Sequence, residues 1–398
     1  MAYDFDSIID RGPESGTFSA KWQGYEDRFP GFAIDTSTAL SMWVADMDFF
    51  TPTEVQQAIF ERAQHGIYGY VSDDAVDVFR RAAQGWFDRR YGFEADTAWM
   101  LFSPGVVPAI YASVQAFTSP GEGVVVQPPV YYPFLGAVRE GGRKLVANQL
   151  LVEDGSYAMD FEALEPLLAD PTNKLLVLCN PHNPVGRVWT RDELGQLLGM
   201  CKQHGVIVLS DEIHADFIMP GEEFCSAGMF EEVHDMLVLA HAASKTFNLA
   251  GLESSLITIP NPLLREKLRK QMHVNCLSHG NTFGPIAGAA AYTHGDRFVD
   301  ELVAYVDGNF HCLEEGLRDK LGMLGFSRPQ GTYLAWIDFA GLGLPEDEVY
   351  RLVLEEAGVA GDLGNWFGPG GENFMRFNLA CPRVRVRELV SRLEVLSQ

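Results

Sequence analysis

Short apolar runs alternate with helix-forming stretches through the middle of the chain, and this alternation constrains the fold more than any other feature. The apolar runs occupy residues 123–126, 174–179, 206–209, 236–240 and 255–259. Strands that alternate with helices predict an α/β fold, with a mainly parallel central sheet and helices on both of its faces. Ligands of such sheets lie beyond the carboxyl ends of the strands. Asn183, Asp211 and Lys245 each follow such a run, so we expect the chemistry there.

The length of the chain predicts more than one domain. At 398 residues it is too long for one ordinary hydrophobic core. We expect a large domain over residues 46–285. A helical region at about 284–321 then leaves the strand–helix pattern, and short strands at 333–339 and 374–378 follow. These elements predict a smaller α+β domain over residues 286–398.

The first 45 residues have the character of an arm. Aromatic side chains are spread through residues 1–45 with little periodicity. Such side chains need a surface to pack on, and we expect that surface to be the small domain or a partner subunit. Two helices, at about 51–65 and 73–91, follow the arm, and a third begins near Gly105 and ends near residue 118.

Composition and charge exclude several classes of protein. The formal net charge is −24, so nucleic acid and anionic membrane surfaces are not expected partners. No apolar run reaches the length of about 18 residues that a membrane span needs, and the acidic N-terminus lacks an apolar signal core, so we expect a cytoplasmic protein. The six cysteines are scattered and are expected to be reduced, and the ten histidines show no metal-ligand spacing.

Lys245 stands out because of its surroundings. Lysines usually lie on solvated surfaces, but this one follows the apolar run 236–240 within a few residues. Small residues precede it, and residues 248–251 after it let the backbone pass close to a bound group. A lysine held in such a place can lose its proton and attack an aldehyde, and the aldehyde that fits is that of pyridoxal 5′-phosphate (PLP).

Four fragments at strand ends strengthen this interpretation when they are taken together. They are N-P-H-N-P-V-G at 180–186, S-D-E-I-H at 210–214, S-K at 244–245 and R-F-N at 376–378. In this order and at this spacing, over nearly the whole length, the chain resembles the fold-type I PLP enzymes of the aminotransferase class I/II superfamily.

Longer motifs point to one branch of that superfamily. W-V-A-D-M-D-F at 43–49, S-K-T-F-N-L-A-G at 244–251 and R-F-N-L-A-C-P-R at 376–383, together with D-E-I-H, resemble the cystathionine β-lyase and cysteine-S-conjugate β-lyase branch. The fold that this implies is the PLP-dependent transferase-like fold.

The resemblance implies roles for residues around the cofactor ring. Lys245 would bind the cofactor covalently and move the Cα proton, and Asp211 would pair with the pyridine N–H so that the ring accepts electrons. Asn183 would donate to the phenolic oxygen, His214 would approach the same oxygen, and Tyr131 would stack on the ring. The alternatives are a helix N-cap for Asp211, a turn residue for Asn183, a structural histidine for His214 and a core or interface aromatic for Tyr131.

The phosphate of the cofactor needs hydrogen-bond donors. The helix that opens at Gly105, Val106 and Val107 has free N–H groups and a dipole that suit an anion. Ser244 adds a hydroxyl. Tyr70, reaching across from a second subunit, is the usual supplement in the family, so a homodimer is expected; packing within its own domain is the alternative.

Two positions depart from the broader superfamily. Ala242 stands three residues before Lys245, where a phosphate-binding serine is frequent, and Glu253 stands eight residues after it, where an arginine is frequent. A glutamate beside a phosphate would be repelled, so Glu253 is expected to point elsewhere. The lyase branch generally lacks this arginine.

The resemblance makes Arg376 the clamp for the substrate α-carboxylate. Its neighbours alternate in polarity as on a half-buried strand, and a buried arginine without an anion is unfavourable, so a substrate carboxylate explains it better than packing does. An ordinary salt bridge is the alternative.

The resemblance favours β-elimination on a small amino-acid substrate. L-cystathionine or a related S-substituted cysteine would be cleaved to a thiol, pyruvate and ammonia. An aminotransferase would use the same residues and the same first steps, so it is the alternative. A bifunctional lyase that also acts as a regulator is a third interpretation.

Overall fold

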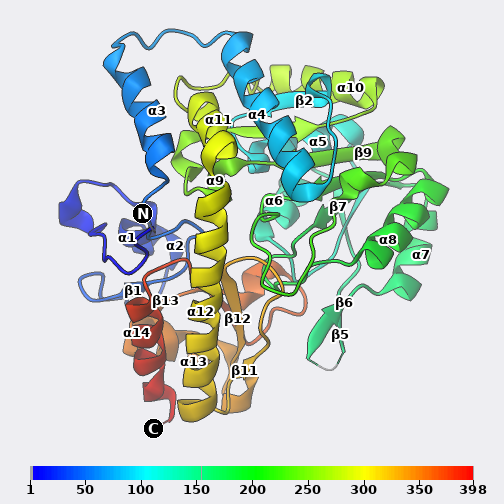
Figure 1. The fold of residues 1–398 in the computed structure, drawn as a ribbon. Coiled ribbons are helices and arrows are strands. Elements are labelled where there is room, and N and C mark those ends of the chain that lie inside the picture. The colour runs from blue at the N-terminus through cyan, green and yellow to red at the C-terminus, as the bar shows by residue number, and fades with distance from the viewer. Residues whose placement is uncertain (1–2, 154, 398) are drawn as a thin grey trace.

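The structure is a computed structural model and describes residues 3–153 and 155–397. A seven-stranded sheet lies at its centre (Figure 1). In spatial order its strands are β2 (Met100–Ser103), β10 (Ser255–Thr258), β9 (Leu237–His241), β8 (Ile207–Asp211), β7 (Asn173–Cys179), β3 (Gly123–Val126) and β4 (Lys144–Ala147). The strands from β9 to β4 pair in parallel, while β10 is antiparallel to both of its neighbours. The predicted mainly parallel sheet is therefore confirmed.

Helices cover both faces of this sheet, as predicted. Alternate strand residues point to opposite faces, so Val124 and Val126 belong to one core and Val125 to the other. The helices of the first core are α5 (Val106–Phe117), α6 (Tyr132–Glu140) and α10 (Pro262–Val274). Those of the second are α4 (Asp73–Tyr91), α7 (Phe161–Ala169), α8 (Arg191–His204) and α11 (Gly284–His294). The helix α3 (Thr53–Gln64) packs against α11, and a two-stranded sheet forms from β5 (Leu151–Glu153) and β6 (Ser156–Ala158).

The long helical region expected at 284–321 is two helices. The first, α11, ends at His294, and α12 (Asp296–Lys320) begins two residues later. The chain divides at Gly295, where an added Cβ would lie 2.2 Å from the Phe247 ring and 2.4 Å from the carbonyl oxygen of Ala291. Only glycine fits such a close approach, and the resulting junction lets α12 run away from the central sheet toward the C-terminal part of the chain (Figure 1).

The C-terminal part of the chain builds a second sheet. Its four antiparallel strands are, in order, β11 (Gly325–Phe326), β12 (Leu334–Asp338), β15 (Phe374–Asn378) and β14 (Asp362–Leu363). The helices α13 (Glu346–Arg351), which continues as a π-helical turn at Leu352–Glu356, and α14 (Arg383–Leu393) accompany it, and α14 packs on α12. This antiparallel arrangement with helices matches the predicted α+β part.

The N-terminal arm packs on this C-terminal part within the same chain. It contains two short helices, α1 (Ala20–Gln23) and α2 (Tyr25–Arg28), and the strand β1 (Leu40–Ser41). β1 pairs in parallel with β13 (Val359–Ala360). The domain boundaries expected after residues 45 and 285 stay predictions.

Within the described residues, no helix combines the length and the apolar character that crossing a membrane requires. The cytoplasmic location expected from the sequence stays a prediction. The described residues also contain no cluster of three or more potential metal ligands.

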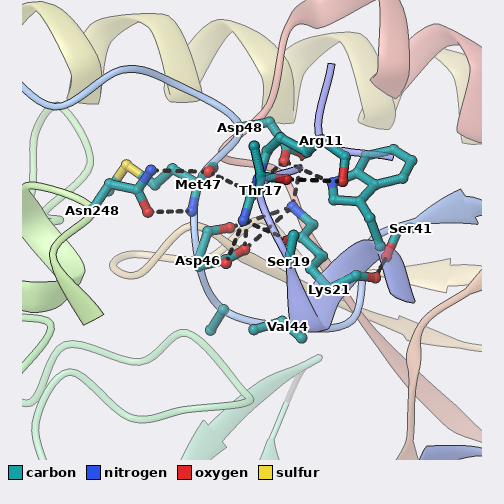
Figure 2. Close-up of polar contacts among 12 residues, drawn as sticks. Arg11, Thr17, Ser19, Lys21, Ser41, Val44, Asp46, Met47, Asp48 and Asn248 are labelled. Atoms are coloured by element: carbon teal, nitrogen blue, oxygen red, sulfur yellow. Dashed lines mark hydrogen bonds and ion pairs between the residues drawn. The ribbon is translucent and has the colours of Figure 1, made fainter. Parts of the chain in front are cut away.

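A buried ion pair fastens the arm. The side chain of Lys21 has no exposed surface, and its Nζ lies 2.7 Å from Oδ2 of Asp48, whose side chain is 7% exposed. Arg11 and the indole N–H of Trp22 bind the other carboxylate oxygen of Asp48 (Figure 2). The ion pair between Lys21 and Asp48 thus holds the arm, and because the pair is buried, solvent screens its attraction much less than that of a surface pair.

We expect Lys21→Met to lower the free energy of unfolding by about 3 kcal/mol, because Asp48 would stay buried without one of its cations. Denaturant unfolding monitored by circular dichroism measures the change. Lys270→Met is the matched control, since Lys270 is 70% exposed and pairs with Glu266 only on the surface. Equal effects of the two substitutions would contradict the structural role of the buried pair.

Candidate functional site

The ends of three neighbouring parallel strands bring the predicted residues together. In the sheet, Cys179 of β7 lies opposite Asp211 of β8, and Asp211 lies opposite Ala240 of β9. Asn183 therefore follows one strand end, Asp211 forms the next, and Lys245 lies on the short helix α9 (Ala243–Thr246) after the third. The strand order places at one edge three residues that are far apart in sequence.

A cavity of about 280 Å³ opens at this edge. Its lining includes nine of the residues predicted for the site, namely Gly105, Val106, Val107, Tyr131, Asn183, Asp211, His214, Ser244 and Lys245. A wider cleft of about 910 Å³, bordered by residues of α4 and α12, contains none of the predicted residues. The smaller cavity is therefore the candidate active site.

Lys245 is held in the cavity by a backbone oxygen. Its Nζ donates to the carbonyl oxygen of Ala45 at 2.7 Å. Burial, and then the nearby Arg376 guanidinium, lower the pKa of Lys245 to about 8. A lysine with this pKa is neutral in an appreciable fraction of molecules at neutral pH, which a nucleophile requires.

Asp211 is buried, with its carboxylate at the cavity wall. Burial raises the pKa of Asp211 to about 7, and the backbone N–H of Ile213 opposes this shift by donating to Oδ1 at 3.1 Å. A turn follows Asp211 and no helix begins there, so the N-cap alternative is wrong. A cationic group inside the cavity would stabilise the ionised carboxylate.

His214 and Tyr131 present polar groups in neutral form. Burial moves the pKa of His214 well below its usual range, and Nδ1 of this buried ring has no partner among the described residues. Burial also raises the pKa of Tyr131, which precedes α6 and contacts Phe134 edge to face. His214 belongs to the lining of the cavity, and an unpaired buried nitrogen is the type of group that a ligand satisfies.

The N-terminus of α5 forms another part of the wall. The backbone of Gly105 has φ 135° and ψ 160°, and no side chain caps the helix. The first N–H groups of α5 have no partners within the helix, so they are available to an anion. Ser244 lines the same cavity.

Sequence reasoning missed Ser254, which follows Glu253 at the edge of the cavity. The Ser254 hydroxyl is buried, lines the cavity and has no partner among the described residues. Its only signal in the sequence is a hydroxyl one residue beyond the superfamily arginine position. Glu253 adopts a left-handed backbone with φ 45°, and it belongs to the lining of the cavity although the residue is exposed, so the expectation that its side chain points away from the phosphate stays a prediction.

Arg376 is 2% exposed and lies behind Asn183. Nη1 of Arg376 donates to Oδ1 of Asn183 at 2.8 Å, which leaves the amide N–H groups of Asn183 free to donate. Nη2 donates to the carbonyl oxygen of Trp43 at 3.2 Å and pairs with Asp362. The salt bridge that was the alternative for Arg376 is therefore present, because β14 supplies Asp362, and the role of Arg376 as the carboxylate clamp stays a prediction. Since a guanidinium has five N–H donors, Nε–H and one Nη1–H of Arg376 remain for a ligand.

Two further contacts at the cavity had no signal in the sequence. The Tyr333 hydroxyl donates to the carbonyl oxygen of Ala45 at 2.8 Å, the same oxygen that Lys245 binds. The ring of Tyr333 also meets His214 edge to face, with 5.6 Å between the ring centroids. Tyr333 therefore joins the strands of the C-terminal sheet to the lysine.

Tyr70 lies apart from the cavity in this chain. It is fully exposed, in the loop between α3 and α4, and Tyr68 beside it is 57% exposed. Tyr70 does not pack within its own domain, which excludes the alternative considered for it.

Comparisons with known proteins agree with this geometry. The family model described as aminotransferase class I and II matches residues 39–393. Cystathionine beta-lyase PatB of Bacillus subtilis (strain 168) is 42% identical over 380 residues, which are 95% of this chain and 96% of that protein. The structure of cystalysin from Treponema denticola, which contains pyridoxal 5′-phosphate, is 33% identical with a TM-score of 0.94, over 100% of this chain and 99% of that one. A PLP-bound putative aminotransferase from Clostridium difficile 630 is 34% identical with a TM-score of 0.94, over 100% of both chains. The chain belongs to the aminotransferase class I and II family, as its sequence motifs indicated.

Proposed function

We propose that the protein is a PLP-dependent carbon–sulfur β-lyase that converts L-cystathionine or related S-substituted cysteines to a thiol, pyruvate and ammonia. One observation carries the proposal: Lys245, with its pKa lowered to about 8, shares a cavity with Asp211. The relatives support the lyase assignment, since a protein 42% identical over most of its length carries the name cystathionine beta-lyase.

The donors around the cavity fit PLP. The free N–H groups of α5 from Gly105 to Val107, with the hydroxyls of Ser244 and Ser254, suit the phosphate. In the same cavity, Asp211 is a buried acid that a pyridine N–H would satisfy. Bound PLP supplies an aldehyde that joins to an amine and a ring that accepts the electron pair of the broken Cα–H bond.

The remaining groups of the cavity would orient the ring. The amide N–H of Asn183 is free because its oxygen accepts from Arg376, so it would donate to the phenolic oxygen. His214 approaches the same region in neutral form, and Tyr131 offers an aromatic face for stacking. Each of these roles follows from a donor or a surface that faces the cavity.

Lys245 would move the proton in the reaction. Its neutral amine would take the Cα proton of the substrate. The carboxylate of Asp211 would keep the pyridine nitrogen of bound PLP protonated, so that the ring can accept the electron pair that this leaves behind. The pair then forms a Cα–Cβ double bond while the Cβ–S bond breaks, and the thiol leaves with a proton. Water completes the hydrolysis of the unsaturated product to pyruvate and ammonia.

Arg376 would bind the α-carboxylate through its unused Nε–H donor. Its bonds to Asn183, Trp43 and Asp362 fix the plane of the guanidinium before the substrate binds. Such preorganisation reduces the entropy lost on binding and aims the Cα–H bond at Lys245.

We also propose a homodimer in which Tyr70 completes the phosphate site of the partner. Two observations support it: Tyr70 is fully exposed, and none of the described residues that line the cavity is an arginine. A two-fold dimer would let each chain contribute its Tyr70 in the same way.

With L-cystathionine as the only substrate, pyruvate and thiol should form in equal amounts over many turnovers. Coupled reduction of pyruvate and a thiol reagent measure the two products. Lys245→Ala is the inactive control. Release of one equivalent of product that stops until a keto acid is added would instead establish the aminotransferase, which remains the second candidate because a putative aminotransferase is equally similar in structure.

Asp211→Asn should retain the fold and bind PLP but lower kcat by roughly 100-fold or more, because a neutral amide no longer holds the pyridine proton. Pyruvate release gives kcat, and the visible absorption of the bound cofactor confirms its occupancy. Full activity in a folded, PLP-loaded variant would remove Asp211 from the mechanism.

Mixing Lys245→Ala with Tyr70→Ala subunits should restore activity if Tyr70 acts across the interface. Random exchange makes half of the dimers mixed, so roughly a quarter of all sites carry neither substitution. Native mass spectrometry verifies the exchange, and Tyr70→Ala alone must first be shown to be badly impaired. With both controls in place, an inactive mixture would exclude the shared site.

A further inference from the structure

The segment of residues 44–48 supplies the carbonyl oxygen that binds Lys245. The carbonyl oxygen of Ala45 accepts from Lys245 Nζ at 2.7 Å and from the Tyr333 hydroxyl at 2.8 Å. The position of this oxygen therefore sets the position of Lys245. What fixes the 44–48 segment also fixes the reactive nitrogen.

One side of the 44–48 segment is fixed by charges of the arm (Figure 2). Asp46 follows Ala45 directly, and its carboxylate binds Nη2 of Arg11 at 2.8 Å. Nζ of Lys21 lies 3.3 Å from the carbonyl oxygen of Asp46 and 3.9 Å from its carboxylate. Arg11 also donates to the carbonyl oxygen of Met47 at 2.8 Å. The cationic side chains of Arg11 and Lys21 thus bind both the carboxylate and the backbone of the residues that follow Ala45.

The opposite side is fixed by Asn248, three residues after Lys245. Its amide accepts from the N–H of Met47 at 3.0 Å and donates to the carbonyl oxygens of Met47 and Phe49 at 3.0 and 2.9 Å. Asn248 has a left-handed backbone with φ 58°, which aims its side chain at the 44–48 segment. Two residues of the lysine-bearing stretch, Lys245 and Asn248, therefore form hydrogen bonds to the segment of residues 44–49.

We propose that Asp46 is a positioning residue for Lys245: held by Arg11 and Lys21, it fixes the Ala45 carbonyl against the lysine nitrogen and presents a negative charge to it. The proposal rests on the proposed function, since it assigns Lys245 as the lysine that binds the cofactor. It adds a residue of the N-terminal segment to a site otherwise built from strand ends.

The charges around Lys245 explain why Asp46 suits this role. Arg376 on β15 lowers the pKa of Lys245, whereas Asp46, Asp211 and Asp362 raise it. His214 faces the lysine as a neutral ring. Tyr131 and Tyr333, whose pKa values burial raises, are also neutral there.

Each of the three carboxylates also has another partner. Asp362 pairs with Arg376, Asp211 would face the cofactor ring, and Asp46 pairs with Arg11. Asp46 differs from the other two because it directly follows Ala45, and it lies outside the lining of the cavity. Its charge therefore acts on Lys245 without touching the substrate.

The test is a pH titration of the visible absorption band of the PLP-loaded protein. Asp46→Asn keeps an oxygen for Arg11 but loses the charge, so the midpoint of the titration should fall by roughly half a pH unit. Asp46→Glu keeps the charge, and its midpoint should stay near that of the wild type. Thermal unfolding of each variant shows whether the fold is intact.

Asp307→Asn is the matched control. Asp307 is 17% exposed and pairs with Arg328, much as Asp46 is 20% exposed and pairs with Arg11, but it is not among the charges that act on Lys245. An unshifted midpoint in folded Asp46→Asn, or an equal shift in Asp307→Asn, overturns the proposal. Failure of Asp46→Asn to fold, beside a folded Asp46→Glu, also overturns it, because the charge would then serve the fold. A wild-type protein without a borohydride-sensitive visible band would instead refute the proposed function itself.

Discussion

The burial of one amine is the constraint on which the rest of the site depends. Lys245 has to be out of water to lose its proton near neutral pH, yet it must not be expelled from the cavity or left without a hydrogen-bond partner. Arg376 brings a second positive charge close by, which makes the lysine still harder to protonate. The surrounding carboxylates of Asp46, Asp211 and Asp362 limit this effect. The pKa of Lys245 thus depends on all of these charges together, so a change in any one of them alters it.

This balance explains why the site draws on every part of the fold. The parallel sheet delivers Asp211 and Lys245 at adjacent strand ends. The C-terminal antiparallel sheet delivers Arg376 together with Asp362, which lie opposite each other in the register of β14 and β15. A carboxylate placed there keeps the guanidinium ionised and oriented in the absence of substrate.

Local sequence patterns predicted many of the helices and strands. They did not predict features that depend on contacts between distant parts of the chain. The strand β15 and the helix α4 lie where the sequence indicates, because a run of alternating residues defines the first and Gly92, in a left-handed conformation, ends the second. The antiparallel direction of β10 depends on which strand it meets, and this leaves no mark in its own composition. Asp362 escaped notice because its pairing with Arg376 follows from sheet register.

The roles of other groups could not be predicted for a different reason. Ala45 acts through its carbonyl oxygen, and every residue has one, so no side-chain pattern could single it out. The buried hydroxyl of Ser254 is a candidate ligand donor because Ser254 lines the cavity, and that cavity forms only when distant segments of the chain pack together. Asn183, by contrast, was recognisable because a rigid proline-flanked motif surrounds it.

The pairing of the arm with the end of the chain has a consequence for biosynthesis. Arg28 binds Asp362 across 334 residues of sequence, and Asn378 binds the carbonyl oxygens of Val44 and Asp46. The arm is translated before these partners, so it leaves the ribosome earlier than they do. Until Asp362 and Asn378 have been made, the arm lacks the C-terminal surface on which it packs. A chain that stalls before Asp362 would expose the arm to proteases and chaperones, so catalytic competence also reports that translation has passed this point.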